Sequence, residues 1–297
     1  MREWTAVVLS NENVATFIKE LVVEVKDRDI SYLPGTYFRF HIPPFKANTQ
    51  LWKRWIGDKY LADWEKSGLF DHEIDFTHLP LEKQKAACAF SIASYPAEGN
   101  RLKFTIRIAL PPPLEGKFPI TIPWGFCSSY AFSLNPGDEI HFSGPYGDAL
   151  MVDDESELVF LIGGAGASFA RSHLMHLLRT QKTKRSVSLW YGARALRDNI
   201  YEVEFKQLEK DFPNFKYHLV LSEPLPEDIE KGWPIDDPLR TNFLHLAFEM
   251  GQLKRIKSPN DCRFYVCGPP LLNKGVLQLL ENYAVDRKNI VLDDFGP

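Results

Sequence analysis

A glycine turn between an apolar run and a helical pattern is the segment best suited to chemistry. The apolar run Leu158–Ile162 is typical of a strand buried on both faces, and it ends at Gly163, Gly164, Ala165 and Gly166. Beyond the turn, Phe169, Ser172 and His173 recur at helical spacing. A helix that starts here points its first N–H groups at the turn, and glycines let a diphosphate come close. The segment therefore predicts dinucleotide binding. An ordinary tight turn is the alternative, because the strict G-x-G-x-x-G spacing is missing.

Two further predicted strands end in residues of the same kind. The strand at 186–191 runs into Tyr191, Gly192, Ala193 and Arg194, and the strand at 263–267 runs into Cys267, Gly268, Pro269 and Pro270. Ligands of open parallel sheets bind beyond the carboxyl ends of the strands, which share one edge. The three segments together predict a ligand crevice. The alternative is that glycines and prolines simply end these strands.

The elements around these residues fall into two halves. Residues 153–297 alternate strands and helices, which predicts a doubly wound parallel sheet, and we expect a nucleotide-binding domain there. Residues 1–152 contain at least six short strand-like segments, which predict an antiparallel β-barrel domain. A Trp-rich stretch at about 46–85 reads as short helices and loops inserted between barrel strands.

Composition excludes several classes of protein. An apolar fraction of 44%, a charged fraction of 25% and a net charge of −4 are those of a soluble globular protein with no basic field for nucleic acid. No apolar window approaches the length of about 18 residues that a membrane helix needs, and the first residues lack a signal-peptide pattern, so a cytoplasmic location is expected. The four cysteines are scattered without a C-x-x-C pair, which predicts neither a metal site nor a disulfide framework.

Long ordered motifs extend over essentially the whole chain: FSIASYPAEGN, TIRIALPPP, CSSYAFSLNPGD, SGPYGD, LWYGAR, SEPLPED, CGPP and DDFG. In these the chain resembles the ferredoxin reductase-like flavoenzymes, in which an FAD-binding barrel precedes a pyridine-nucleotide domain. More narrowly, it is similar to the FAD and NADH module of the F subunits of sodium-translocating NADH:quinone oxidoreductases. Members of that family also carry a membrane helix and a ferredoxin domain with four cysteine ligands. Neither is found in this sequence, which we expect to be an excised module or a shorter relative.

The resemblance implies a role for each matching residue. Ser91 would lie close to the reactive N5 of the flavin and Phe90 against its ring. The FAD diphosphate would be held by Gly125, Cys127, Ser128 and Ser129. The NADH diphosphate would face Gly163–Gly166, and its adenosine half would run along Tyr191–Arg194. Cys267, Gly268 and Pro269 would lie near the nicotinamide, and Phe295 would cover the flavin; the catalytic set implied is Ser91, Cys267 and Phe295, with no metal.

Four positions depart from the family pattern. Cys88 stands where the family has an arginine that pairs with the FAD diphosphate, and Phe90 replaces a tyrosine. Ile162 and Phe169 replace a glycine and a proline near the nicotinamide. Loss of the arginine removes a charge-assisted contact worth about 1.5–3 kcal/mol. Arg107, on the strand LKFTIRIAL, either substitutes for it in part or is a solvated strand residue.

The leading hypothesis is a reductase module in which NADH gives hydride to FAD and electrons pass to an iron–sulfur or quinone acceptor. A 2Fe-2S cluster would then belong to a missing or separate ferredoxin-type domain, and membrane subunits of the quinone oxidoreductase would be partners at the inner face of the membrane. Two alternatives stay open. A degenerate relative would bind flavin weakly or not at all and act as a binding or assembly subunit, and a free flavin reductase would use FAD as a substrate.

Overall fold

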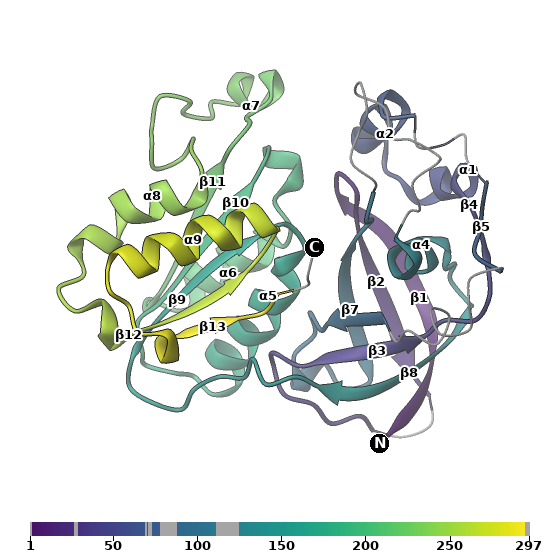
Figure 1. Cartoon of the computed structure of the whole chain (residues 1–297), viewed down its shortest axis with the longest axis horizontal. Helices are drawn as coiled ribbons and strands as arrows, with labels where there is room; N and C mark the ends of the chain where they lie inside the picture. Colours follow the sequence, from purple (N-terminus) through teal and green to yellow (C-terminus); the bar gives the residue numbers. More distant parts are fainter. Residues whose placement is uncertain are drawn as a thin grey trace. The chain divides into compact units, whose positions relative to one another are not determined.

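The computed structural model describes residues 2–26, 29–68, 70, 73–77, 88–110 and 125–294, with the Trp55 side chain left out. The chain divides into two compact units, Met1–Gly147 and Asp148–Pro297, which we describe one at a time (Figure 1).

The first unit is built on an antiparallel six-stranded sheet with strand order β6-β3-β8-β1-β2-β7. Its strands are β1 (Glu3–Ala15), β2 (Ile18–Val25), β3 (Tyr37–His41), β6 (Cys88–Ser91), β7 (Arg101–Arg107) and β8 (Glu139–Tyr146). The two ends of this order approach each other where the Ala93 N–H donates to the Lys103 carbonyl at 2.8 Å. The sheet therefore curls round as a barrel, which confirms the predicted fold class of this half.

The segment between β3 and β6 contributes to the core of the first unit. It contains α1 (Thr49–Trp52), α2 (Asp58–Lys66) and a short ribbon of β4 (Lys46–Asn48) with β5 (Glu73–Asp75). Trp52, Tyr60 and Trp64 are buried, and the two tryptophans pack against Phe132 of α4 (Phe126–Ser133). Burial of such large apolar surfaces makes the segment part of the folded unit.

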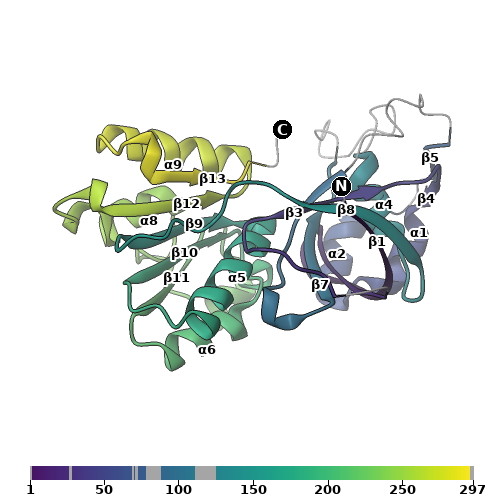
Figure 2. The same ribbon diagram turned by 90° about the horizontal axis from the view of Figure 1, so that it is seen from below.

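The second unit is a parallel five-stranded sheet with order β11-β10-β9-β12-β13, which confirms the predicted α/β class. Its strands are β9 (Glu157–Gly163), β10 (Val187–Ala193), β11 (Phe215–Leu221), β12 (Cys262–Cys267) and β13 (Ile290–Leu292). Its helices are α5 (Ala167–Met175), α6 (Glu202–Asp211), α7 (Pro226–Glu230), α8 (Leu244–Gly251) and α9 (Pro270–Asn282). Figure 2 shows α8 and α9 on one face of the sheet and α5 and α6 on the other. The sheet is thus doubly wound, and its central strands are apolar because both faces are covered.

The start of the second unit is tied to its sheet by charged and polar contacts. Asp154 accepts from Arg185 Nη2 at 2.8 Å and from Arg263 Nε at 2.7 Å. The Val152 N–H donates to the hydroxyl of Tyr265 at 3.0 Å. One carboxylate therefore joins the segments before β9, before β10 and within β12.

Candidate functional site

The three strand ends predicted to form a crevice do meet at one edge of the sheet. The register pairs Gly192 with Gly163 and Cys267 with Ile162. A Cβ added to Gly268 would lie 3.2 Å from the Gly163 amide nitrogen, so these ends are in close contact. The topology brings together residues that lie about 100 positions apart in the sequence.

Gly166 has no room for a side chain. It closes the 3₁₀ turn Gly164–Gly166 that leads into α5, and an added Cβ would lie 2.3 Å from the Cys267 carbonyl oxygen. The cap residues Gly163 and Gly166 supply no side-chain acceptor to the first N–H groups of the turn or of α5. A helix start of this kind presents N–H groups and the positive end of its dipole to an anion.

Tyr191 and Arg194 differ in what they can offer a ligand. The Tyr191 ring is completely buried, and its hydroxyl donates to the Gly164 carbonyl at 3.0 Å. This hydrogen bond holds the backbone of the glycine turn in place, so the Tyr191 side chain positions the turn and does not face a ligand. Arg194 is exposed, 3.8 Å from the carboxylate of Asp198, and its guanidinium reaches solvent.

The Cys267 thiol is completely buried at the end of β12. Burial is the main cause that raises its pKa well above the ordinary value of a thiol, and the negative charges of Asp293 and Asp294 add to the effect. The nearest of these carboxylate oxygens, Oδ2 of Asp293, lies 3.9 Å from the sulfur. Cys267 is therefore a neutral thiol at neutral pH, which suits packing beside a ring and not nucleophilic chemistry.

Two residues of α9 at this edge, Leu272 and Asn273, are not predicted from the sequence motifs. The side chain of Leu272 fills the space above Gly163, Gly192 and Gly268, where added Cβ atoms would meet it at 2.5, 3.5 and 3.1 Å. Asn273 is buried, and neither polar atom of its side chain has a hydrogen-bond partner among the described residues. A buried amide without partners is costly unless a ligand or water completes it. No signal in the sequence distinguishes either residue from its helical neighbours.

Phe169 and His173, on the buried side of α5, lie within the core of the second unit. Phe169 packs against His173 in a tilted arrangement with ring centroids 4.4 Å apart, and Tyr265 lies close to both rings. The imidazole Nδ1 donates to the Phe169 carbonyl at 2.9 Å. Burial lowers the pKa of His173 to about 4. The family departure at Phe169 thus fills the core beneath the helix.

In the first unit, the predicted flavin residues lie on β6 and at the start of α4. Phe90 packs edge-on against Phe40 at 5.0 Å, and Ser91 is buried at the end of β6 beside Tyr37 of β3. Cys127, Ser128 and Ser129 form the first turn of α4, whose cap residue Gly125 supplies no side-chain acceptor. A Cβ at Gly125 would lie 2.5 Å from the Ala109 Cβ, so only glycine fits there.

The two serines of this turn are used differently. Ser128 Oγ accepts from the Ala109 N–H at 2.9 Å and donates to the Gly125 carbonyl at 3.2 Å. The proton of the hydroxyl is therefore engaged, so the backbone N–H is the donor that Ser128 can offer a ligand. Ser129 Oγ is buried with no hydrogen-bond partner among the described residues.

A disulfide joins Cys88 of β6 to Cys127 of α4, with Cα atoms 5.5 Å apart. The scattered spacing of the four cysteines does not predict this bond. Cys127 consequently offers a ligand only its backbone, and Cys88, where the resemblance implies an arginine, is a neutral, bonded group. The bond ties the strand that carries Phe90 and Ser91 to the first turn of α4.

The far end of α4 is held by two other strands. Asn11 Nδ2 donates to the Ala131 and Leu134 carbonyls at 2.8 Å each, and Lys19 Nζ donates to the Phe132 carbonyl at 3.3 Å. Burial lowers the pKa of Lys19 to about 7. Carbonyls at a helix C-terminus attract donors and cations, so these side chains anchor α4.

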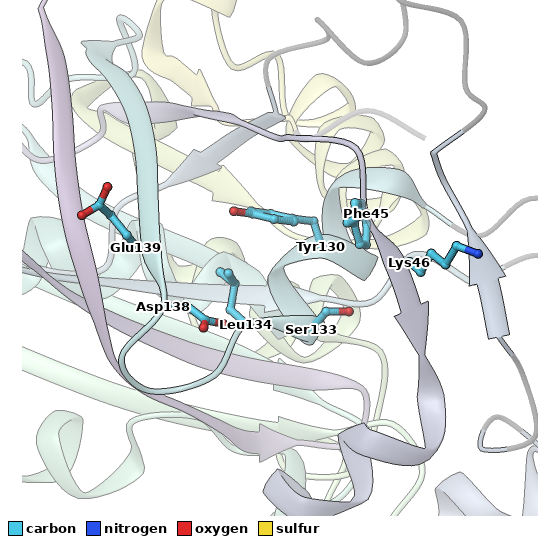
Figure 3. A pocket seen from close by; sticks show the side chains of 7 residues that line it. All are labelled: Phe45, Lys46, Tyr130, Ser133, Leu134, Asp138 and Glu139. Carbon is cyan, nitrogen blue, oxygen red and sulfur yellow. The ribbon is translucent and has the colours of Figure 1, made fainter.

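A pocket of about 300 Å³ opens beside this end of α4 (Figure 3). Tyr130 lies in the pocket between Phe45 and the Asp138–Glu139 segment. Burial of the phenol, and to a lesser extent the negative charge of Asp138, raises the pKa of Tyr130. Lys46, Ser133 and Leu134 complete the lining. Lys46 is paired with Asp75, and Asp138 accepts from the Asn135 N–H. The pocket contains none of the predicted site residues.

Two predicted residues, Arg107 and Phe295, remain to be placed. Arg107 is exposed at the end of β7, two residues before the Ala109 that contacts Gly125. Phe295 lies outside the described residues.

Comparison with known proteins identifies the family. Residues 160–278 match the oxidoreductase NAD-binding domain. The F subunit of the Na⁺-translocating NADH-quinone reductase of Chlamydia pneumoniae is 55% identical over 294 residues, a match that covers 99% of this chain and 68% of that protein. The chain belongs to the family of these F subunits. The F subunit of Psychrobacter cryohalolentis is 39% identical and is matched over 100% of this chain and 68% of its own length.

Comparison with solved structures supports the fold of this chain. The structure of a cytochrome P450 reductase from Amycolatopsis superposes with a TM-score of 0.68 at 19% sequence identity. The match covers 100% of this chain and 70% of the reductase chain. The FAD/NAD-binding domain of nitric oxide dioxygenase from Vibrio cholerae has a TM-score of 0.66 at 19% identity, with 99% of both chains covered. A ferredoxin-NADP⁺ reductase from Plasmodium falciparum has a TM-score of 0.61 at 16% identity and covers 97% of this chain and 94% of that one. The chain therefore has the two-domain ferredoxin reductase-like fold.

In the part of the chain that the structure describes, no helix combines the length and apolar character that crossing a bilayer requires. The relatives named above are subunits of a Na⁺-translocating reductase.

Proposed function

We propose that the chain accepts hydride from NADH onto FAD, with NADH bound by the second unit and FAD by the first. The observation that carries the proposal is the edge of the second sheet, where three glycine-bearing strand ends surround the start of α5 and Gly166 leaves no space for a side chain. Membership of the F-subunit group and the match to the NAD-binding domain support the choice of NADH.

The residues present fit the two cofactors. Gly125 and Gly166 are each packed too closely for a Cβ, and each precedes a helix without a side-chain cap, as diphosphate binding requires. Ser129 Oγ and the Asn273 amide are buried groups whose hydrogen bonds remain to be completed. FAD, when bound, supplies an acceptor that takes two electrons as hydride and can release them singly.

The chain itself supplies binding, orientation and exclusion of water. The first-turn N–H groups of α4 hold the FAD diphosphate, while Phe90 and Ser91 line the ring. Gly163–Gly166 hold the NADH diphosphate, with Gly192, Ala193 and Arg194 along its adenosine half. Cys267, Gly268 and Pro269 would pack beside the nicotinamide. Hydride transfer depends on two flat rings held together away from water, and these residues provide that setting.

We infer that the electrons pass to a 2Fe-2S centre on a ferredoxin-type domain, or to quinone through membrane subunits. Such partners would hold the module at the inner face of the membrane.

The first test is a visible absorption spectrum of the purified protein, repeated after anaerobic addition of NADH. A flavin band that bleaches on addition supports the proposal. A colourless protein that also fails to bind added FAD refutes it.

A second candidate is a binding or assembly subunit without tight flavin. It is favoured by Cys88, a bonded neutral residue where the family carries a cation for the diphosphate. Cys88→Arg and Cys88→Ser both remove the disulfide, but only the first adds a charge. Tighter FAD binding and faster NADH oxidation in Cys88→Arg than in Cys88→Ser favour the enzyme, and identical behaviour favours the binding role. Turnover that needs added FAD, with none retained after gel filtration, identifies a free flavin reductase.

A further inference from the structure

The Cys88–Cys127 disulfide joins the two elements that the proposed function places at opposite ends of the flavin site. Cys88 starts β6, two residues before Phe90, and Cys127 is the second residue of α4, in the turn proposed to hold the diphosphate. The two cysteines are 39 positions apart in the sequence. The bond therefore fixes the ring-lining strand relative to the diphosphate turn.

The other contacts of α4 lead to different elements, among them Trp52 of α1 and Trp64 of α2, which pack against Phe132. Its N-terminal end is hydrogen-bonded to Ala109, just beyond β7, through Gly125 and Ser128. Its C-terminal end is held by Asn11 of β1 and Lys19 of β2. The disulfide is the covalent link between α4 and β6.

The strand on the other side of the bond is short, and the residue Ala93 just beyond it ties it to β7 by donating its N–H to the Lys103 carbonyl. β6 has four residues and lies at one end of the strand order, paired with β3 from Tyr37↔Ser91 to Phe40↔Cys88. So short a strand contributes few backbone hydrogen bonds of its own, which leaves the disulfide a large share in fixing its position relative to α4. Cutting the disulfide would let β6 move relative to α4 while the helix keeps its other anchors.

We propose that Cys88 and Cys127 form a reversible two-electron switch that sets the affinity of the first unit for FAD. The proposal rests on the proposed function, because it requires that FAD binds between these two elements. In the oxidised state the bond holds ring and diphosphate contacts at a fixed separation, and preorganisation of this kind increases affinity. In the reduced state the two elements separate, and FAD binding must order them again at a cost in free energy.

The reductant is a dithiol. Cys127 is half-buried and Cys88 is buried, so the thiolate of the dithiol attacks the Cys127 sulfur. The Cys88–Cys127 bond breaks, the Cys88 sulfur leaves with the bond electrons and takes up a proton, and a mixed disulfide forms on Cys127. The second thiol of the reductant then displaces Cys127, which also takes up a proton. In total, one disulfide gains two electrons and two protons, and the reductant becomes a disulfide.

The test is a titration of the flavin-free full chain with FAD, before and after reduction with dithiothreitol, followed by quenching of flavin fluorescence. Intact mass after alkylation establishes the state of the bond in each sample. We expect FAD to bind about tenfold more weakly to the reduced protein, as loss of preorganisation implies, and to recover its affinity after reoxidation. The double variant Cys88→Ser/Cys127→Ser should bind FAD like the reduced wild type and ignore dithiothreitol. Cys262→Ser, which removes a buried thiol in the other unit, should keep the full redox response.

Each outcome decides the matter. Equal FAD affinity in the two states, with the bond shown to be cut, overturns the switch and leaves the proposed function intact. Four free thiols in the protein as purified from air-exposed solution also overturn it. Absence of FAD binding in both states refutes the proposed flavin site and the switch with it.

Discussion

Replacing Gly166 by alanine should damage the nucleotide edge of the second unit more than any comparable change there. The added Cβ would lie 2.3 Å from the Cys267 carbonyl oxygen and 2.8 Å from its carbonyl carbon, whereas real Cβ contacts essentially never fall below 3.0 Å. Both opposing atoms belong to the backbone of β12, so no side chain can turn away. The start of α5 must move by at least 0.7 Å relative to β12, the difference between 3.0 and 2.3 Å. Overpacking of this severity costs about 1–3 kcal/mol.

The cost should appear in two measurements. In calorimetry, the unfolding midpoint of the second unit should fall by about 2–12 °C, since 1 kcal/mol corresponds to roughly 2–4 °C in a domain of this size. In isothermal titration, NADH should bind about tenfold more weakly, because the N–H groups that face the diphosphate are displaced.

Gly192→Ala provides the matched control for the unfolding measurement, since Gly192 itself is proposed to lie along the adenosine half of NADH. Its Cβ would come no closer than 3.3 Å to its nearest neighbour, the Leu244 Cβ, so a small adjustment accommodates it. If Gly166→Ala unfolds and binds NADH like the wild type, the close approach of α5 and β12 is wrong. If Gly192→Ala is equally damaging, the effect belongs to glycine replacement in general and the argument from geometry fails.

Three further predictions concern buried charge. Because the folded pKa of His173 is about 4 and the unfolded value about 6.5, the unfolded chain binds more protons between these values. The second unit should lose about 2 kcal/mol of stability between pH 7.5 and pH 5, measured by hydrogen exchange of β9 amides, and His173→Phe should flatten that loss. Lys19, with a folded pKa of about 7, should make the first unit about 2 kcal/mol more stable at pH 9 than at pH 7 in urea unfolding, and Lys19→Met should abolish the rise. Asp154→Asn should cost the second unit about 1–3 kcal/mol by leaving Arg185 and Arg263 without their carboxylate, whereas Asp153→Asn, at a neighbouring position, should change little.

The layout of the second unit could be predicted from its sequence because local pattern and global fold agree there. The continuous apolar run of β9 and the largely apolar β10 and β12 are typical of a sheet covered on both faces, and glycines lie at the end of each strand. The three-residue β13 has no counterpart among the predicted strands, because so short a strand has no periodicity of its own. It becomes a strand through pairing with β12.

The parts that escaped prediction depend on contacts between distant residues. Nothing near Cys88 or Cys127 indicates that their Cα atoms lie 5.5 Å apart, because the barrel topology alone brings β6 to α4. Leu272 and Asn273 read as ordinary helical residues until the strand order places α9 over the glycines. Likewise, Lys19 occupies an unremarkable strand position, and its burial follows from where α4 ends.

The strand order of the second unit also has a consequence for synthesis on the ribosome. The central strand β9 pairs on one side with β10, which follows within about 30 residues, and on the other with β12, about 100 residues later. Emerging at about 5–20 residues per second, the nascent chain holds β9, β10 and β11 for several seconds before β12 can join them. During that interval one long edge of β9 is unpaired and apolar, and Gly166 has no opposing backbone. The nucleotide cannot assist these early steps, so the nascent unit depends on its first three strands, or on a chaperone, to avoid aggregation.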